Sequence, residues 1–177
     1  MSETLSGIPS IIYGLFGMIF FVVFLKWDYS LMAGAATAAI MVLPTILSTT
    51  KEALDAVPDS YREGSFALGT GKLRTIFKVV LPAAVPGILS GIILAIGRIV
   101  GETAALLYTS GTATRGLTKG LMSSGRTLAV HMYTISSEGF HTKQTFATAV
   151  ILLVFVFIIN TLSSVAAKQI SKKAGGQ

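Results

Sequence analysis

Two ionisable residues, Arg98 and Glu102, stand inside a long apolar stretch of the sequence, and their side chains suggest a specific chemistry. A guanidinium donates paired hydrogen bonds to a tetrahedral oxyanion. A neighbouring carboxylate repels a fully deprotonated oxyanion, but it accepts a hydrogen bond from a protonated one such as hydrogen phosphate. The two residues together therefore suggest an anion site that distinguishes phosphate from sulfate.

A structural interpretation of the same pair competes with this one. Arg98 and Glu102 lie one helical turn apart, so they can pair along a helix and reduce the cost of burying each charge. A charged residue at the bilayer centre costs about 2.5–3.5 kcal/mol on insertion scales, and such residues usually face a water-filled cavity or the interior of a helix bundle. Because two apolar residues would avoid this cost, the presence of the charges favours the functional interpretation.

The helix that must position these charges has one face made of small residues. On a wheel of 100° per residue, about 80° of arc contains Gly87, Gly91, Ala95, Arg98 and Glu102. The opposite face carries bulky aliphatic residues, among them Ile88, Ile92, Ile96 and Ile99. Gly87 with Gly91, and Gly97 with Gly101, follow the GxxxG pattern that lets membrane helices approach closely. These four glycines are therefore predicted to be helix-packing residues.

The composition is that of a membrane protein. Of the 177 residues, 52% are hydrophobic and 12% are charged, and the mean hydropathy is +0.73. Four uncharged runs are each close to the roughly 20 residues that a helix needs to cross a bilayer. They predict an all-α membrane protein with four transmembrane helices, at residues 8–25, 30–50, 83–108 and 144–167.

The distribution of basic residues predicts the orientation of these helices. The loop at 51–80 and the C-terminal tail together carry eight Lys and Arg residues, against five in the segments on the other side. Since cytoplasmic loops are enriched in Lys and Arg, the loop 51–80 and both termini are expected in the cytoplasm, and the loop 109–143 outside it. The net charge of +6 does not indicate nucleic-acid binding, because the basic residues are not interleaved with aromatic ones.

The loop 51–80 is expected to contain short helices. Pro58 disfavours a helical conformation at the residue before it, Asp59 can cap the helix that follows, and Gly69 suits the left-handed position after that helix ends. The sequence GTGKL at 69–73 lacks two of the residues that define a phosphate-binding loop, so the chain is not expected to hydrolyse nucleotide. Apolar residues mixed with the charges indicate that the loop packs on another molecule.

Other catalytic and metal-binding patterns are missing from the sequence. There are no cysteines, no paired carboxylates arranged for hydrolysis and no Ser, His, Asp order of a catalytic triad. The spacing of His131 and His141 matches no metal site. Residues 127–139 are predicted to form a short surface helix, and the N-terminal residues lack the basic region and cleavage site of a signal peptide.

The loop and the helix after it resemble the permeases of ABC importers. The cytoplasmic signature of that family is EAA, three residues, Gly, nine residues, and then I-x-L-P. The same spacing here gives Glu63-Gly64-Ser65, Gly69 and Val79-Val80-Leu81-Pro82. In the family this loop is a coupling helix that docks into a groove of an ATPase subunit. The resemblance therefore assigns ATPase coupling to Glu63, Gly64, Ser65, Leu68, Gly69, Leu81 and Pro82.

A narrower resemblance is to the phosphate-specific permease subunits of the PstA type. It is carried by IPSIIYGLFG at 8–17, TTKEALDAVPDSYREGSFALG at 49–69 and GRIVGETAALLYT at 97–109. The companion PstC-type subunit shares GET, but the residues after it usually differ from ALLYT. A proline is common in PstA-type chains where Ala105 stands here. The resemblance implies that Arg98, Glu102 and Thr103 line the anion path, at an interface between two permease subunits.

Such type I importer permeases have six helices, and the four helices expected here match the last four. Residues 1–177 are therefore expected to form one partial permease domain that lacks the first two helices. The implied partners are a PstC-type permease subunit, a cytoplasmic ATPase dimer, an extracytoplasmic phosphate-binding protein and membrane lipid. The chain is expected to be no enzyme and to bind no cofactor, because ATP and magnesium would bind to the ATPase.

The resemblance thus predicts a permease subunit of an ATP-driven phosphate importer in the inner membrane of a prokaryote. Three alternatives remain open. In the first, the solute is another oxyanion or a different small molecule, because the EAA spacing is shared among importers. In the second, the chain acts as a channel or an ion-coupled transporter that works without an ATPase. In the third, it is a membrane scaffold, and Arg98 and Glu102 can both be replaced by leucine without loss.

Overall fold

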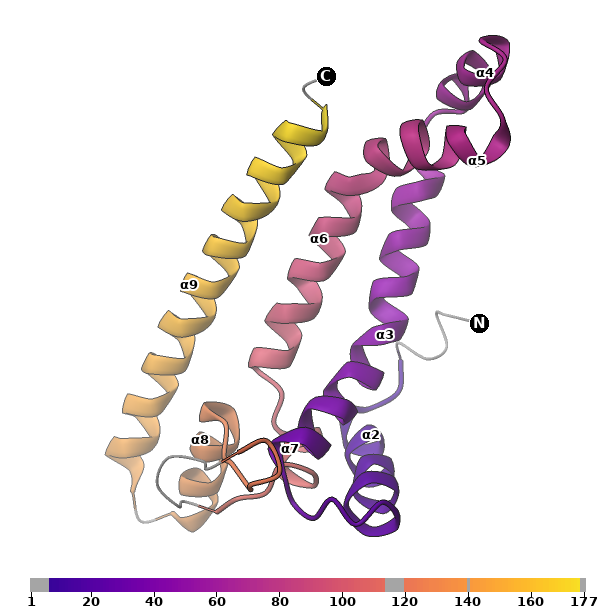
Figure 1. The fold of residues 1–177 in the computed structure, drawn as a ribbon. Helices are drawn as coiled ribbons and strands as arrows, with labels where there is room; N and C mark the ends of the chain where they lie inside the picture. The colour runs from indigo at the N-terminus through magenta and orange to yellow at the C-terminus, as the bar shows by residue number, and fades with distance from the viewer. Residues whose placement is uncertain (1–6, 114–119, 140, 176–177) are drawn as a thin grey trace.

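The computed structural model describes residues 7–113, 120–139 and 141–175, and the regular elements in these ranges are all helical. Three long helices lie side by side, with α6 (Leu81–Val100) between α3 (Leu31–Asp55) and α9 (Thr142–Gly175) (Figure 1). The fold is therefore all-α, as the sequence predicts.

Three helical segments are long and apolar enough to cross a membrane. They are Leu31–Asp55, Lys72–Val100 and Thr142–Ile170. The first apolar run forms a shorter helix over Ser10–Phe24, in which α2 (Ser10–Gly17) continues into the π-helical segment η1 (Met18–Phe24). The prediction of a first helix at 8–25 thus coincides with a helix that is shorter than the other three.

The two ends of the long helices carry different structures. The short helices α4 (Asp59–Ala67) and α5 (Lys72–Thr75) project from the end where α3 finishes and α6 begins (Figure 1). The opposite end carries α7 (Ala104–Leu107), α8 (Leu128–Glu138) and the turn between η1 and α3. The helix α8 coincides closely with the surface helix predicted at 127–139.

The predicted helix at 83–108 differs from the observed one at both ends. Helical structure begins earlier, because α5 continues through a π-helical segment, η2 (Ile76–Val80), into α6. The wider π turn directly precedes the first turn of α6, which contains Pro82. At the other end, α6 finishes at Val100, and Gly101 is its C-cap residue with φ −87° and ψ −2°. The helix is therefore broken before Glu102.

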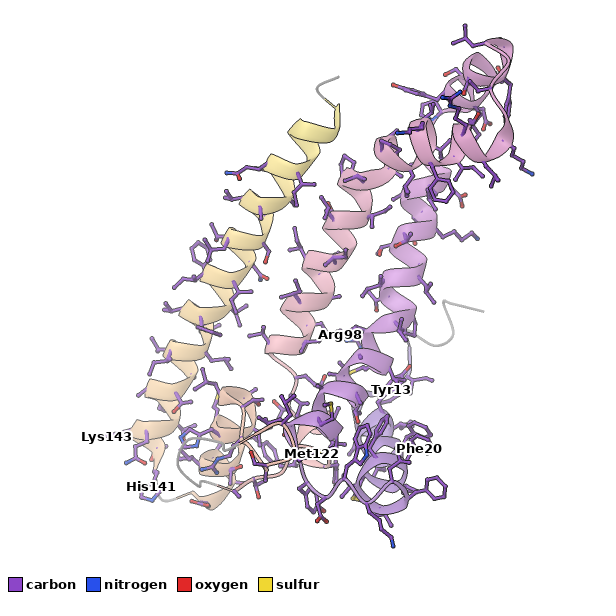
Figure 2. The ribbon with its side chains drawn as sticks, viewed as in Figure 1. Tyr13, Phe20, Arg98, Met122, His141 and Lys143 are labelled. Atoms are coloured by element: carbon purple, nitrogen blue, oxygen red, sulfur yellow. The ribbon has the colours of Figure 1, made fainter. Side chains whose placement is uncertain are left out.

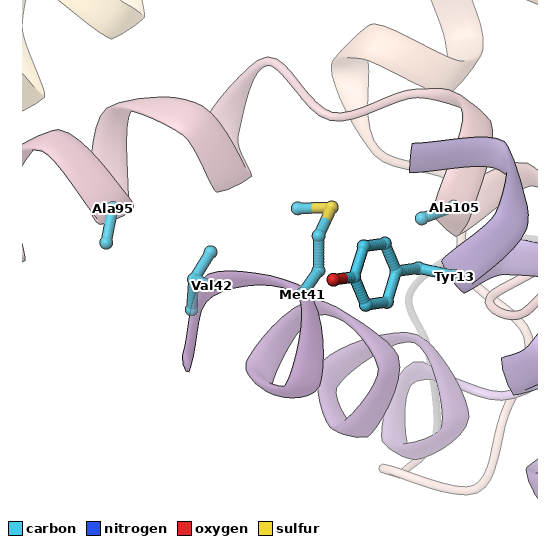
Figure 3. Packing of buried hydrophobic residues seen from close by; sticks show 5 residues of the cluster. All are labelled: Tyr13, Met41, Val42, Ala95 and Ala105. Atoms are coloured by element: carbon cyan, nitrogen blue, oxygen red, sulfur yellow. The ribbon is translucent and has the colours of Figure 1, made fainter. Parts of the chain in front are cut away.

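The main hydrophobic cluster ties the short first helix to the long ones. Tyr13 of α2 packs with Met41 and Val42 of α3, and Ala95 of α6 and Ala105 of α7 complete the cluster (Figure 3). Side chains from four helices thus meet in one buried group. This packing fixes the end of α6 that carries Arg98 relative to α2, α3 and α7.

Candidate functional site

Arg98 and Glu102 occupy different structural environments. Arg98 lies in the last turn of α6 with an exposed side chain, at the end of the helix that leads into α7 (Figure 2). Glu102 lies beyond the end of α6 and is only 7% exposed. Among the described residues the one ion pair within 4.0 Å joins Arg62 to Asp59, so Arg98 and Glu102 do not pair. The competing structural interpretation, a pair along one helix, is therefore wrong, because the helix ends between the two residues.

The carboxylate of Glu102 instead binds the backbone of α7. Its Oε1 accepts a hydrogen bond of 3.1 Å from the N–H of Ala105. Ala105 is 0% exposed. Thr103 is half-buried at the start of α7, and its hydroxyl lies 3.5 Å from the Gly101 carbonyl oxygen. The break therefore places Glu102 and Thr103 at the start of α7, beyond the end of α6 that carries Arg98.

The four predicted packing glycines do not share one role. A Cβ at Gly87 would come within 2.6 Å of the Ala53 Cβ on α3, and one at Gly91 would overlap the side chain of Thr49 on the same helix. A Cβ at Gly97 would lie 3.1 Å from Oδ1 of Asn160 on α9. These three glycines therefore let α6 approach its two neighbours closely.

The fourth glycine of the pattern has no packing contact with another helix in the part of the chain that the structure describes. The one described atom within 4 Å of a Cβ at Gly101 would be the Gly97 carbonyl oxygen of the same helix. Gly101 is the C-cap residue at which α6 ends, and a packing role for it stays a prediction. Glycine suits a helix end because it has the lowest helix propensity after proline.

The coupling residues inferred from the sequence lie at the other end of the molecule. Leu68 is 85% exposed after the end of α4, and Glu63, Gly64 and Gly69 are exposed as well. Other large apolar side chains are exposed around them, namely Tyr61, Phe66, Leu73 and Phe77. Leu81 and Pro82 are half-buried at the base of α6. The motif thus divides into an exposed apolar tip and a packed base.

Gly69 ends the helix α4 as the sequence predicts. Its φ of 76° is left-handed, which glycine adopts without the steric cost that a side chain brings. The N–H of Gly69 donates to the Phe66 carbonyl oxygen at 2.9 Å, and the N–H of Thr70 donates to that of Ser65 at 3.3 Å. These two bonds form a Schellman motif, which turns the chain back toward α5.

Three hydroxyl groups, those of buried Ser65 and Thr75 and of half-buried Thr70, hold α4 against α5. The Ser65 Oγ lies 2.5 Å from Thr70 Oγ1 and 2.9 Å from Thr75 Oγ1. Ser65 is 8% exposed and Thr75 is 1% exposed, so these contacts are shielded from water. Ser65 occupies the position where the importer signature carries its second alanine. The hydroxyl at this position therefore joins the exposed tip to the helix that continues into α6.

Replacing Ser65 by alanine restores the residue of the importer signature but removes the centre of this hydroxyl cluster. We expect the loss of about 1–2 kcal/mol of stability in the tip, because Thr75 Oγ1 loses a buried partner. Hydrogen exchange of the peptide spanning 63–76 measures the loss, with Ser60→Ala, an exposed serine at the start of α4, as the matched control. Equal exchange in both variants would mean that the cluster does not stabilise the tip.

Arg62 fixes the orientation of α4 relative to α3. Its Nη1 lies 2.6 Å from Asp59 Oδ1, and its Nη2 donates to the Leu54 carbonyl oxygen at 3.0 Å. Asp59 was expected to cap α4, but Pro58 occupies the N-cap and no side chain caps the helix. The capping prediction for Asp59 is therefore wrong, because its carboxylate pairs with Arg62 one turn further along α4.

Sequence patterns gave no signal for several of these contacts. Thr70 and Thr75 follow Ser65 by five and ten residues, and the turn at Gly69 brings the three hydroxyls together. Gly14 of α2 lies against α7, where its Cβ would come within 2.8 Å of the Ala105 Cα. The one sequence signal for this contact was that Gly14 is a glycine within an apolar helix. The described residues contain no cluster of potential metal ligands.

The fold and the site define a multi-pass helical membrane protein with a helical tip, at one end of its spans, that exposes apolar side chains. The chain belongs to the family described as "Binding-protein-dependent transport system inner membrane component", whose model matches residues 1–175. Membership of this family agrees with the importer-permease resemblance of the loop signature. The prediction of the family is therefore confirmed.

Individual relatives are similar over most of the chain. A "Phosphate transport system permease protein PstA" of Yersinia pestis is 38% identical over 168 residues, which are 93% of this chain and 56% of the relative. "Phosphate transport system permease protein PstA 2" of Mycobacterium bovis is 38% identical over 158 residues, 89% of this chain and 52% of the relative.

A third relative has a name that gives no solute. It is the "Probable ABC transporter permease protein YqgI" of Bacillus subtilis, 36% identical over 149 residues, 77% of this chain and 51% of the relative. The chain thus spans about half the length of these relatives. No solved structure matches the chain.

Proposed function

We propose that the chain is a permease subunit of an ATP-driven importer of inorganic phosphate. The family membership and the names of the PstA relatives support this proposal. The observation that carries it is the exposed apolar tip around Glu63, Leu68 and Gly69, placed where a coupling helix requires an accessible surface. In this function the chain transports its solute and catalyses no reaction.

One helical segment links the tip to the candidate anion site. Lys72 to Val100 form a single long segment, with α5 at the tip and Arg98 in the last turn at the far end. A movement of α4 is passed through the Ser65 and Thr75 hydroxyls to this segment. An ATP-driven change at the tip can therefore shift Arg98 relative to α2 and α3, which is the kind of movement that alternating access requires.

The anion path is assigned to the region around the break between α6 and α7. Arg98 supplies an exposed guanidinium with no ion-pair partner within 4.0 Å in the described ranges. Its position at the C-terminal end of α6 is favourable for a cation, because that end of a helix carries partial negative charge. Arg98 contacts the oxyanion, and Thr103 lines the path beside it.

The partners follow from this assignment. A second permease subunit of the PstC type completes the path, and an ATPase dimer binds the tip and holds ATP and magnesium. A phosphate-binding protein delivers the anion at the end that carries α7 and α8. The protein lies in the inner membrane of a prokaryote, with the tip and both termini on the cytoplasmic side.

The proposal is tested by reconstituting the transporter, with its ATPase and second permease subunit, in vesicles that contain the phosphate-binding protein. Radiolabelled phosphate uptake is expected to require ATP, and excess sulfate is expected not to compete. Uptake without ATP or ATPase would favour an ion-coupled transporter. Competition by sulfate would favour another oxyanion as the solute.

Glu63→Lys is expected to abolish capture of the ATPase by the permease. Glu63 is exposed on α4 beside the apolar tip, so a reversed charge disrupts a docked surface without affecting the buried core. The measurement is co-purification of the ATPase with tagged permease. Glu138→Lys, the same charge reversal on exposed α8 at the other end, is the matched control. If both variants capture the ATPase equally, the tip is not the docking surface.

A further inference from the structure

We infer that Glu102 is a positioning residue that caps α7 and holds it on α2, and that it does not contact the transported anion. The inference rests on the proposed function and refines one part of it. The first observation is the hydrogen bond that Oε1 of Glu102 accepts from the Ala105 N–H at 3.1 Å. Thr103 is the N-cap residue of α7 and its side chain does not cap the helix. Glu102, the residue before it, supplies the acceptor that an N-cap side chain usually provides.

The break in the helix creates the need for this bond. After α6 ends, the first N–H groups of α7 have no carbonyl oxygen one turn earlier to accept from them. The first bond within α7 runs from the Leu107 N–H to the Thr103 carbonyl oxygen, at 2.9 Å. The Ala105 N–H comes before that bond and belongs to a residue that water does not reach. Without Glu102 it would be a buried donor with no partner given by the structure, which is strongly unfavourable.

The capped residue is also the point where two backbones meet. A Cβ at Gly14 of α2 would come within 2.8 Å of the Ala105 Cα and within 3.1 Å of the Ala104 carbonyl oxygen. The surfaces of α2 and α7 are therefore in direct backbone contact. A shift of α7 by a fraction of an ångström would separate or overlap them, so the cap at Ala105 fixes this contact.

The residues after α7 hold other parts of this end of the molecule. The Thr109 carbonyl oxygen accepts from the Ser30 N–H at 3.1 Å, just before α3 begins. The Ser110 carbonyl oxygen accepts from the Gly125 N–H at 3.1 Å and from Ser124 Oγ at 2.9 Å. Thr109 and Ser110 are both buried. By holding α7, Glu102 fixes the site at which α3 and the segment before α8 are attached.

The capping role changes the interpretation of the charged pair. The Glu102 carboxylate was predicted to accept a hydrogen bond from a protonated oxyanion, but this carboxylate is buried and its Oε1 accepts a hydrogen bond from the backbone. Arg98 remains as the exposed cation. The capping bond holds Glu102 on α7, beyond the end of α6, so Glu102 does not pair with Arg98. The capping bond needs an acceptor and does not need a negative charge, which makes the two roles separable by substitution.

The test compares Glu102→Gln with Glu102→Met in the complete reconstituted transporter. Glutamine keeps an oxygen that can accept the Ala105 N–H, whereas methionine has similar length and lacks a strong acceptor. One readout is ATP-driven phosphate uptake, and the other is hydrogen exchange of the peptide spanning 103–110. We expect Glu102→Gln to keep uptake within about twofold of the parent, and Glu102→Met to lower uptake and exchange protection by about tenfold each.

Two results would overturn the inference. One is a Glu102→Gln protein that keeps exchange protection but loses uptake, because the carboxylate charge itself would then act on the anion. The other is a Glu102→Met protein with parental protection. If Glu102→Met fails to assemble, the uptake of Glu102→Gln decides alone, with retention supporting the cap. If the parent moves no phosphate, the proposed function fails, and the exchange comparison still decides the capping role.

Discussion

Arg98→Met is expected to lower phosphate uptake by the assembled transporter by about a hundredfold, with ATPase capture unchanged. The guanidinium lies exposed at the end of α6, and no described carboxylate lies within 4.0 Å to share its charge. Methionine has a similar length and no charge, so it leaves packing intact and removes both donors of a paired bond to the oxyanion. Each such bond to a charged group contributes roughly 1.5–3 kcal/mol.

Two further variants separate anion contact from general effects of charge. Arg98→Lys keeps the charge but not the planar fork, so uptake is expected to fall to an intermediate level. Lys143→Met removes an exposed cation near the start of α9 and is expected to leave uptake unchanged. The rate of initial uptake at saturating ATP is the measurement. Parental uptake by Arg98→Met would remove Arg98 from the anion path and favour a structural role for it.

A helix or a helix end could be predicted from the sequence where a single local signal was strong. The four long uncharged runs predicted four membrane-spanning helices, because a helix satisfies its own backbone in lipid. Three of them are helices long enough to span a membrane, and the first is shorter. Gly69 was found because a left-handed helix end strongly prefers glycine. The break after Val100 was missed, since an apolar and small-residue pattern continues through it without interruption. Because the break was missed, a pair of Arg98 and Glu102 along one helix stood as an alternative in the sequence analysis.

The missed contacts have a common physical cause. The Ser65 and Thr75 hydroxyls meet only after the chain reverses at Gly69, and Gly14 meets Ala105 only after two helices pack. Neither contact leaves a periodic pattern in the sequence, because each depends on a single close approach that forms only after the chain turns or two helices pack. By contrast, the repeated spacing of Gly87 and Gly91 revealed a packing face, and both lie against α3.

Gly14→Leu is expected to destabilise the protein by about 3 kcal/mol, because the new side chain must enter a contact between two backbones. Its Cβ alone would lie 2.8 Å from the Ala105 Cα, 3.1 Å from the Ala104 carbonyl oxygen and 3.3 Å from the Ala105 carbonyl oxygen. Backbone atoms cannot rotate away as a flexible side chain can, so α2 must move off α7. The apparent Tm of the purified assembly is the measurement, and uptake is expected to fall with it.

Gly64→Ala is the matched control, because it also adds a side chain to a glycine inside a helix. Nothing lies within 4 Å of a Cβ at Gly64. Alanine exceeds glycine in helix propensity by about 1 kcal/mol, so this variant should have an equal or higher Tm. If Gly14→Leu matched that result, α2 would not rest on α7 in the assembled transporter. The capping bond of Glu102 would then hold α7 but not α2. Only the positions of α3 and of the segment before α8 would depend on this bond.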